Sequence, residues 1–178
     1  MAHGDLAVDP PRGLTASMIP DSLLTEAEAL LDACRSRGVT LATVESCTGG
    51  LIAATLTAIA ASSDVLERGF VTYSNEAKHE LVGVPMDLIQ AHGAVSEEVA
   101  RAMATGGVTH SRATLAVSVT GVAGPGGGTA SKPVGLVCFG LAYRGETTIS
   151  TQEIFPGDRT AIRAAAVAKA FALIRERV

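Results

Sequence analysis

The sequence is poor in aromatic residues and carries no excess of basic ones. Phe, Trp and Tyr together make up 3% of the 178 residues, and tryptophan is absent. Lys and Arg number 14 against 18 Asp and Glu, so the formal net charge is −4. Nucleic-acid binding generally needs a basic surface, and single strands are often held on aromatic side chains. We therefore expect no nucleic-acid partner.

Cysteine is scarce, and long apolar runs are missing. Cys34, Cys47 and Cys138 lie far apart and form no C-x-x-C pair. This spacing disfavours a zinc site or a disulfide framework and favours a reducing compartment. No uncharged apolar run approaches the roughly 20 residues that a membrane-spanning helix needs, and the N-terminus lacks the pattern of a signal peptide. These absences predict a cytoplasmic protein with no membrane partner, metal or cofactor.

The sequence does contain a hydrophobic fraction of 47%, enough for a packed core in a chain of this length. Residues 1–20 carry prolines and glycines without an apolar period, so we expect a disordered tail there and one folded domain over residues 21–178. Apolar periodicity, β-branched runs and helix-capping residues divide that domain. We expect helices at 23–34, 51–60, 75–81, 85–93, 96–108 and 158–177, and strands at 39–44, 70–73, 115–119, 134–143 and 147–155.

The order of these elements indicates an α/β fold. Strands separated by helices favour a parallel sheet that is covered on both faces. The last two strands are joined by the short turn Arg144-Gly145, which predicts an antiparallel hairpin. We infer a three-layer α/β/α sandwich with a mixed, mostly parallel five-stranded sheet.

The segment Glu45–Gly50 lies at a predicted strand-to-helix junction. Such a turn exposes side chains at the sheet edge, and the helix that follows presents free N–H groups. The N–H groups of Thr48, Gly49 and Gly50 could therefore stabilise an oxyanion or a phosphate. The same pattern is also that of a simple glycine turn in which Ser46 or Thr48 caps the helix.

Two adjacent side chains of this turn, Ser46 and Cys47, are candidate nucleophiles. A serine needs an activating base, whereas a cysteine is nucleophilic without one. Tyr73 and Lys78 lie at the next strand end and in the helical turn after it, and strand ends of an α/β sheet form the usual binding crevice. Both could therefore face Ser46, and Asn75 in the same turn is a candidate substrate contact.

A lysine base must be neutral at the pH of the reaction. The ordinary lysine pKa is about 10.4, so bringing that of Lys78 near 7 would take about three units, most of them from burial. An exposed Lys78 could not be the direct base. It could still act as a cation that lowers the pKa of Tyr73, whose phenolate would then take the proton.

A glycine-rich loop follows the third predicted strand, and five of its nine residues, Thr120–Gly128, are glycine. Such a loop can hold a phosphate or a ribose through its N–H groups. It matches neither a P-loop nor the dinucleotide fingerprint. Lys132 and Arg159 are cations in the following part of the chain, although a surface role would also explain them. The candidate substrate contacts in this region are Thr120, Gly121, Gly124, Gly126 and Arg159.

Taken together, these segments resemble the CinA C-terminal domain family. The resemblance extends over about Leu23–Ile174, and the segments occur in the order seen in that family. The segments are Glu45-Ser46-Cys47-Thr48-Gly49-Gly50, Tyr73-Ser74-Asn75-Glu76-Ala77-Lys78, His92-Gly93-Ala94-Val95-Ser96, Thr120–Gly128, Lys132-Pro133-Val134-Gly135 and Gly157-Asp158-Arg159.

The resemblance implies a nicotinamide-nucleotide amidohydrolase of the stand-alone form. Such an enzyme hydrolyses the carboxamide of nicotinamide mononucleotide to nicotinate mononucleotide and ammonia, which serves pyridine-nucleotide salvage and NAD recycling. The family's enzymes use a serine, a tyrosine and a lysine and no metal. These three residues match Ser46, Tyr73 and Lys78. The implied fold is the α/β/α sandwich inferred above.

Several alternatives stay open at this stage. Cys47 could be the nucleophile in place of Ser46, and either Tyr73 or Lys78 could accept the proton. The domain could also be a nucleotide-binding module of the same fold without catalysis, or a purely structural one. An apolar chain of low charge makes a homo-oligomer, a dimer, the expected state.

Overall fold

The computed structural model describes residues 19–178, so the predicted tail at residues 1–20 falls almost wholly outside the described residues. Among the helices of this part of the chain, none combines the length and the apolar character that crossing a bilayer requires. The elements in chain order are α1 (Asp21–Arg37), β1 (Leu41–Glu45), α2 (Leu51–Thr57), a short 3-10 helix η1 (Ser62–Asp64), β2 (Leu66–Val71), α3 (Asn75–Val82), α4 (Met86–His92), α5 (Glu97–Thr109), β3 (Leu115–Gly121), β4 (Leu136–Tyr143), β5 (Ile149–Ile154) and α6 (Arg159–Arg175).

The five strands form one sheet in the order β2-β1-β3-β4-β5. β1 pairs in parallel with both β2 and β3, whereas β4 is antiparallel to β3 and to β5. All strands except β4 therefore run in the same direction. This topology confirms the predicted mixed sheet and its closing hairpin.

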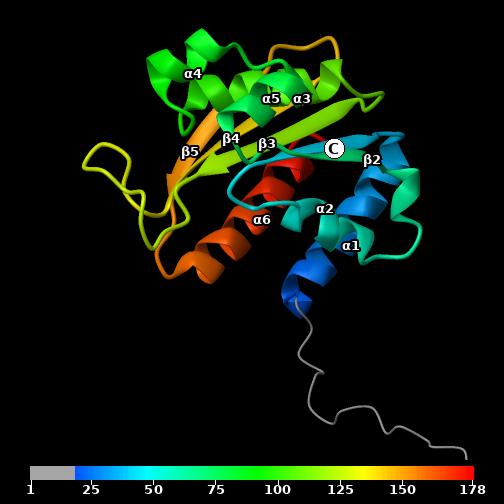
Figure 1. Cartoon of the computed structure of the whole chain (residues 1–178). Coiled ribbons are helices and arrows are strands. Elements are labelled where there is room, and N and C mark those ends of the chain that lie inside the picture. Colours follow the sequence, from blue (N-terminus) through cyan, green and yellow to red (C-terminus); the bar gives the residue numbers. More distant parts are fainter. Residues whose placement is uncertain (1–18) are drawn as a thin grey trace, which may run out of the picture.

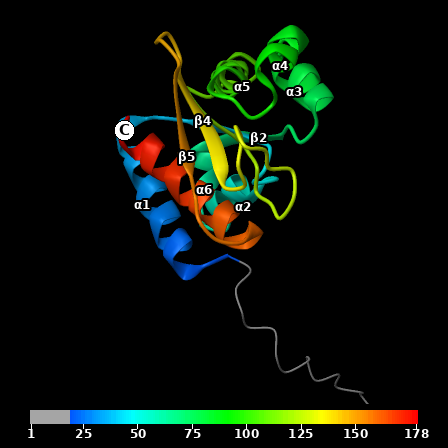
Figure 2. The same cartoon turned by 90° about the vertical axis from the view of Figure 1, so that its left-hand side faces the viewer.

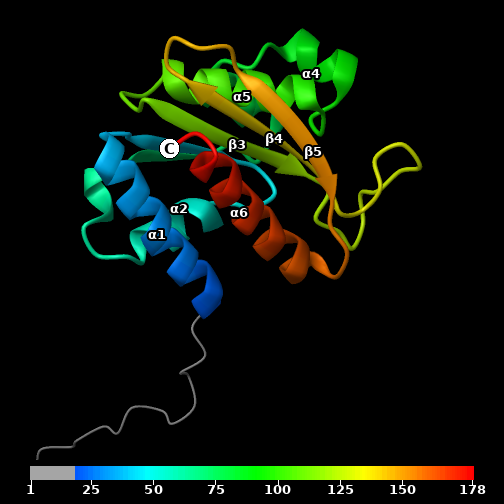
Figure 3. The same cartoon turned by 180° about the vertical axis from the view of Figure 1, so that it is seen from behind.

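Helices cover both faces of the sheet. α3, α4 and α5 lie on one face, and α1, α2 and α6 lie on the other (Figure 1). A view turned by a quarter shows the strands between these two groups (Figure 2). Seen from behind, α1 and α6 cross the sheet side by side (Figure 3), and they contact each other. The predicted three-layer sandwich is confirmed.

Local sequence explains where several helices begin. Ser74, Ser96 and Asp158 each accept a hydrogen bond from the N–H group three residues further on, at 3.0, 3.3 and 2.9 Å. Serine and aspartate are preferred at this position because their oxygens satisfy an otherwise unpaired helix N–H group. Single capping residues therefore predict where α3, α5 and α6 begin.

β2 differs from the prediction, since it spans Leu66–Val71 and not residues 70–73. The sequence Glu67-Arg68-Gly69 breaks the apolar pattern of a buried strand. An edge strand tolerates this composition, and in the part of the chain that the structure describes β2 pairs with β1 alone. Thr72 and Tyr73 consequently follow the strand and belong to the loop that leads into α3. α2 also ends earlier than predicted, at Thr57.

Gly106 and Gly107 lie inside α5, where glycine normally weakens a helix. Close packing explains them. A Cβ atom on Gly106 would lie 1.9 Å from the carbonyl oxygen of Val82, and one on Gly107 would lie 2.7 Å from Val44 Cγ2. The two glycines thus let α5 pack directly against α3 and the sheet.

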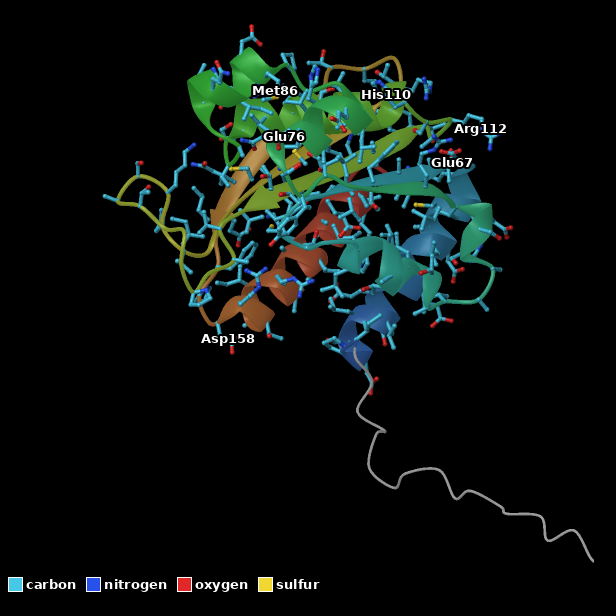
Figure 4. All side chains as sticks on the ribbon, in the orientation of Figure 1. Glu67, Glu76, Met86, His110, Arg112 and Asp158 are labelled. Carbon is cyan, nitrogen blue, oxygen red and sulfur yellow. The ribbon has the colours of Figure 1, made fainter. Side chains whose placement is uncertain are left out.

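Labelled residues show toward which end of the molecule the parallel strands run. Glu67 near the start of β2 and Arg112 just before β3 form an ion pair, with Arg112 Nε 3.3 Å from Glu67 Oε1. Figure 4 shows this pair at one end of the molecule and Asp158, the cap of α6, at the other. The carboxyl ends of β1, β2 and β3 point toward the Asp158 end, where a binding crevice is expected in an α/β sheet.

Candidate active site

A cavity of about 230 Å³ opens beside the carboxyl ends of β1, β2 and β3. These strands are parallel neighbours, so the residues that follow them meet at one edge of the sheet. Segments far apart in sequence therefore supply its walls. The lining residues are Ser46, Cys47, Tyr73, Asn75, Lys78, Ala94, Val95, Thr120, Gly121, Ala123 and Arg159.

The side chain of Lys78 reaches Ser46 in this cavity. Lys78 Nζ lies 3.1 Å from Ser46 Oγ, 2.9 Å from the carbonyl oxygen of Thr72 and 3.5 Å from that of Ser74. Lys78 is 1% exposed, and within residues 19–178 no carboxylate oxygen lies within 4.0 Å of its amine. Burial lowers the pKa of Lys78, because desolvation disfavours the charged amine.

A neutral amine fits these three partners. It has two N–H groups and one lone pair, whereas an ammonium group has three N–H groups and no lone pair. As an ammonium group, Lys78 donates to all three oxygens; as a neutral amine, it would donate to the carbonyl oxygens of Thr72 and Ser74 and leave its lone pair for the hydroxyl of Ser46. The arrangement suits a lysine that takes the serine proton.

The start of α3 explains how Lys78 comes to be buried. Ser74 caps the helix, and the N–H group of Lys78 donates to its carbonyl oxygen at 3.2 Å. Long side chains on a helix point back toward its N-terminus. This direction carries the amine toward Thr72 and Ser46 and away from solvent. Lys78 therefore has the burial that a lysine base requires.

Tyr73 lines the same cavity but lies differently from the expectation. Its side chain is 62% exposed, and its hydroxyl accepts a hydrogen bond from Arg159 Nη2 at 3.3 Å. Within residues 19–178 it makes no hydrogen bond with Ser46 or Lys78. The structure brings the lysine, and not the tyrosine, into contact with the serine hydroxyl.

Glu45 organises the turn that carries Ser46. Its buried carboxylate accepts hydrogen bonds from the N–H groups of Gly50, Ile52 and Ala53 at 3.1, 3.0 and 2.9 Å, and from Thr43 Oγ1 at 3.1 Å. A carboxylate at this place also interacts favourably with the positive end of the α2 dipole. The residue before Ser46 thus ties the turn to the first turn of α2.

This capping changes which N–H groups can meet a ligand. The N–H group of Gly50 is taken by Glu45, and that of Gly49 donates to the carbonyl oxygen of Ser46 at 3.0 Å. Within residues 19–178, the N–H group of Thr48 donates no hydrogen bond, and that of Cys47 meets only the thiol of its own residue. Of the three N–H groups expected to hold an oxyanion, only that of Thr48 lacks an acceptor among the described residues, although Thr48 is fully buried and lies outside the cavity lining.

We expect Glu45→Gln to lower the free energy of unfolding by about 1.5–3 kcal/mol, the usual worth of hydrogen bonds to a charged group. The amide keeps one acceptor oxygen, but it loses the charge and turns an acceptor into a donor that faces N–H groups. Urea denaturation measures the change, with Glu28→Gln on the exposed face of α1 as the control. Equal stability of the two variants would contradict this role of Glu45.

The thiol of Cys47 is a weaker candidate nucleophile than the hydroxyl of Ser46. Burial raises the pKa of Cys47 to about 11. The thiolate is the nucleophilic form of cysteine, and it is scarce at neutral pH when the pKa is this high. Although both side chains line the cavity, only the serine hydroxyl has a candidate base within hydrogen-bond distance.

A second cavity, of about 330 Å³, adjoins the first and shares Ala123 and Arg159 with it. Gly124 lines this second cavity, and its carbonyl oxygen accepts a hydrogen bond from Arg159 Nη1 at 2.8 Å. The hydroxyl of Thr120 is turned inward and donates to the carbonyl oxygen of Ala94 at 2.8 Å. Gly126 is exposed and lines neither cavity.

Two residues of this site were not expected from the sequence. Glu45 could have been noticed as an acid beside a glycine turn, but its pairing depends on how the turn folds back. Arg163, on α6, donates to the carbonyl oxygens of Cys47 and Thr48, and no local pattern marks it. Within residues 19–178, no three His, Cys, Asp or Glu side chains gather as metal ligands would.

Comparison with known proteins identifies the family. The family model "CinA C-terminal domain" matches residues 24–178. The chain is 48% identical over 153 residues to "Nicotinamide-nucleotide amidohydrolase PncC" of Escherichia coli K12, which covers 86% of this chain and 93% of that protein. It is 52% identical over 147 residues to a "Putative competence-damage inducible protein" of Symbiobacterium thermophilum, but spans only 34% of that longer protein.

Solved structures agree with this assignment. The competence/damage inducible protein CihA from Agrobacterium tumefaciens is 43% identical and superposes with a TM-score of 0.86, over 89% of this chain and 96% of the other. A CinA superfamily protein from Klebsiella pneumoniae, 37% identical, gives 0.83 over 87% of this chain and 96% of the other. The chain therefore belongs to the CinA C-terminal domain family.

Proposed function

We propose that this protein hydrolyses the carboxamide of nicotinamide mononucleotide to nicotinate mononucleotide and ammonia, through an acyl-enzyme on Ser46. The observation that carries the proposal is the contact between Ser46 Oγ and the buried amine of Lys78. The likeness to PncC over most of both chains supports the choice of substrate. The reaction would return the pyridine ring to NAD synthesis.

In the first half of the reaction, the neutral amine of Lys78 accepts the proton of the Ser46 hydroxyl as Ser46 Oγ attacks the carboxamide carbon. The carbonyl oxygen gains negative charge in the tetrahedral intermediate. The N–H groups of Cys47 and Thr48 are placed next to the attacking residue and would hold this oxyanion. One such donor is typically worth about 3–4 kcal/mol of barrier.

The intermediate then collapses, and Lys78 returns its proton to the nitrogen that leaves as ammonia. A nicotinoyl ester on Ser46 remains. In the second half, water attacks this ester and Lys78 accepts a proton from the water. The C–O bond to Ser46 breaks, the serine regains its proton, and nicotinate mononucleotide leaves. Each proton that Lys78 takes is given back, so the enzyme ends as it began.

The adjoining cavity offers a place for the rest of the nucleotide. The first cavity holds the nucleophile, and the second lies beyond Arg159, which lines both. A guanidinium group suits a phosphate because it presents several N–H groups in one plane. We propose that Arg159 and the glycine loop hold the ribose phosphate, with Tyr73 at the entrance. Asn75, Thr120 and Gly121 would line the path of the pyridine ring.

Incubation of the purified protein with nicotinamide mononucleotide in the presence of EDTA tests the proposal. The expected result is one ammonia and one nicotinate mononucleotide for each nucleotide consumed. Binding without turnover, seen as a higher melting temperature but no ammonia, would support a nucleotide-binding module. If the protein shows neither binding nor turnover of the nucleotide, the result would support a purely structural domain.

Cys47→Ala separates the two candidate nucleophiles. Because the thiol of Cys47 is protonated at neutral pH and Ser46 has the base, we expect the variant to keep kcat within a few-fold of the wild type. The substitution leaves the N–H group of residue 47 in place. Ammonia release at saturating substrate is the measurement, and a loss as deep as that of a Ser46 variant would make Cys47 the nucleophile.

A further inference from the structure

Arg163, on α6, donates two hydrogen bonds to the turn that carries Ser46. Its Nε donates to the carbonyl oxygen of Cys47 at 3.2 Å, and its Nη2 donates to that of Thr48 at 2.7 Å. Arg163 lies in the second turn of α6, 116 residues after Cys47 in the chain. The two hydrogen bonds tie the turn to the helix layer on the α1, α2 and α6 face.

Because the peptide bond is planar, a hydrogen bond that holds the carbonyl oxygen of a peptide also fixes the direction of its N–H group. In a trans peptide the C=O and N–H groups of one unit point in opposite directions. Arg163 holds the carbonyl oxygen of the Cys47–Thr48 peptide, so the N–H group of Thr48 points away from the guanidinium. Ser46 and Cys47 line the cavity, whereas Arg163 and the fully buried Thr48 do not. The guanidinium therefore lies on the carbonyl side of the Cys47–Thr48 peptide, outside the cavity lining.

Three other N–H groups of the turn, those of Ser46, Gly49 and Gly50, already donate hydrogen bonds. Glu45 takes the N–H group of Gly50, the N–H group of Gly49 donates to Ser46, and the N–H group of Ser46 itself donates to the carbonyl oxygen of Val119 at 2.9 Å. Within residues 19–178, the amide donors of the turn with no acceptor in another residue are those of Cys47 and Thr48. The hydroxyl of Thr48 is likewise buried without a partner in this part of the chain.

We propose that Arg163 is a positioning residue, which aims the N–H group of Thr48 at the developing oxyanion by holding the carbonyl oxygens of Cys47 and Thr48. This inference rests on the proposed amidase function. The hydrogen bond to the Cys47 carbonyl also polarises the Cys47–Thr48 peptide and strengthens its N–H group as a donor. No carboxylate of residues 19–178 lies within 4.0 Å of the guanidinium, so its positive charge also favours an anion across the turn.

Arg163→Ala and Arg163→Lys test this role, with Lys169→Ala as the matched control. Lys169 lies on the same helix, and its amine pairs with Glu153 at 3.3 Å, away from the cavity. We expect Arg163→Ala to lose about 10²–10³-fold in kcat, as for a lost oxyanion donor, with KM nearly unchanged. Arg163→Lys should fall short as well, because lysine lacks the planar guanidinium that places one N–H donor on each of the two carbonyl oxygens.

Two further readouts separate positioning from a general loss of structure. Methylguanidinium in solution should restore part of the kcat of Arg163→Ala and leave Lys169→Ala unchanged. The thiocarboxamide analogue of nicotinamide mononucleotide places sulfur, a weaker acceptor, where the oxyanion forms. We expect the preference of the wild type for the oxygen substrate to shrink in Arg163→Ala by a factor similar to its loss of kcat.

The outcomes are distinct. A wild-type protein that releases no ammonia overturns the proposed function, and this inference with it. An active wild type with Arg163→Ala at full kcat overturns the inference alone. So does an Arg163→Ala variant that slows on both substrates equally and gains nothing from methylguanidinium, since that would show only a structural role.

Discussion

Ser46→Ala should reduce the release of ammonia from nicotinamide mononucleotide by about 10⁴–10⁶-fold, the loss seen when a serine nucleophile is removed from a hydrolase. The hydroxyl oxygen is the atom that would form the acyl bond, and among the described residues the other candidate nucleophile of the cavity, Cys47, has no hydrogen bond to a base. The fold should survive, because the alanine removes one buried oxygen and one hydrogen bond, worth about 1 kcal/mol. The substrate should still raise the melting temperature of the variant.

Ser36→Ala is the control for this result. Ser36 lies on α1, and its hydroxyl donates to the carbonyl oxygen of Ala33 at 2.8 Å, outside the cavity. Ammonia release by this variant should equal that of the wild type. If Ser46→Ala also turned over within tenfold of the wild type, the assignment of Ser46 as the nucleophile would be wrong.

Lys78→Met should lower kcat by about 10²–10⁴-fold, the usual contribution of a positioned general base. Methionine has a similar length and no titratable group, so it fills the space of the lysine stem but cannot take the proton of Ser46. The effect on KM should be small, because the amine contacts the nucleophile and two carbonyl oxygens.

The same variant should change stability with a characteristic pH dependence. Burial lowers the pKa of Lys78 in the folded protein, whereas the unfolded chain keeps the ordinary value of 10.5. The unfolded chain therefore binds more protons between these two values, and the wild type loses stability as the pH falls through that window. Each unit of pKa difference is worth about 1.4 kcal/mol.

Methionine removes this pH-dependent loss of stability. It also removes the hydrogen bond from Lys78 to the carbonyl oxygen of Thr72, whose contribution does not depend on pH. The free energy of unfolding of Lys78→Met relative to wild type should therefore be greatest near neutral pH and decline as the pH rises toward 10.5. Lys169→Met, which removes a half-exposed lysine that is ion-paired with Glu153, is the control for the loss of a lysine side chain as such. A stability difference for Lys78→Met that stays constant with pH would mean that its amine titrates normally.

The fold could be predicted because its signals are local. Ser74, Ser96 and Asp158 mark the starts of helices, and the turn at Arg144-Gly145 marks a hairpin. The start of β2 could not be predicted, since Glu67-Arg68-Gly69 becomes a strand only through its pairing with β1. Gly106 and Gly107 weaken the helical pattern of α5, and only the packing against Val82 and Val44 explains them.

The sequence could predict that the candidate residues come together at one edge of the sheet, but not which of them contact each other. The motifs identified Ser46, Tyr73 and Lys78, and all three line one cavity. Which of them touch depends on side-chain direction and burial, which no motif encodes. The roles of Glu45 and Arg163 were missed because their partners are backbone groups of a turn, and backbone groups carry no sequence signature.

The proposed mechanism depends above all on an uncharged Lys78 amine beside Ser46, and NMR of protein carrying ¹³C at the lysine Cε positions tests this directly. Lys78→Met assigns the Lys78 resonance by its loss. The proposed mechanism predicts that this resonance titrates below 10.5, because burial lowers the pKa of Lys78. A Lys78 amine that stays protonated until the pH reaches 10.5 would contradict it, and another group would have to accept the proton of Ser46.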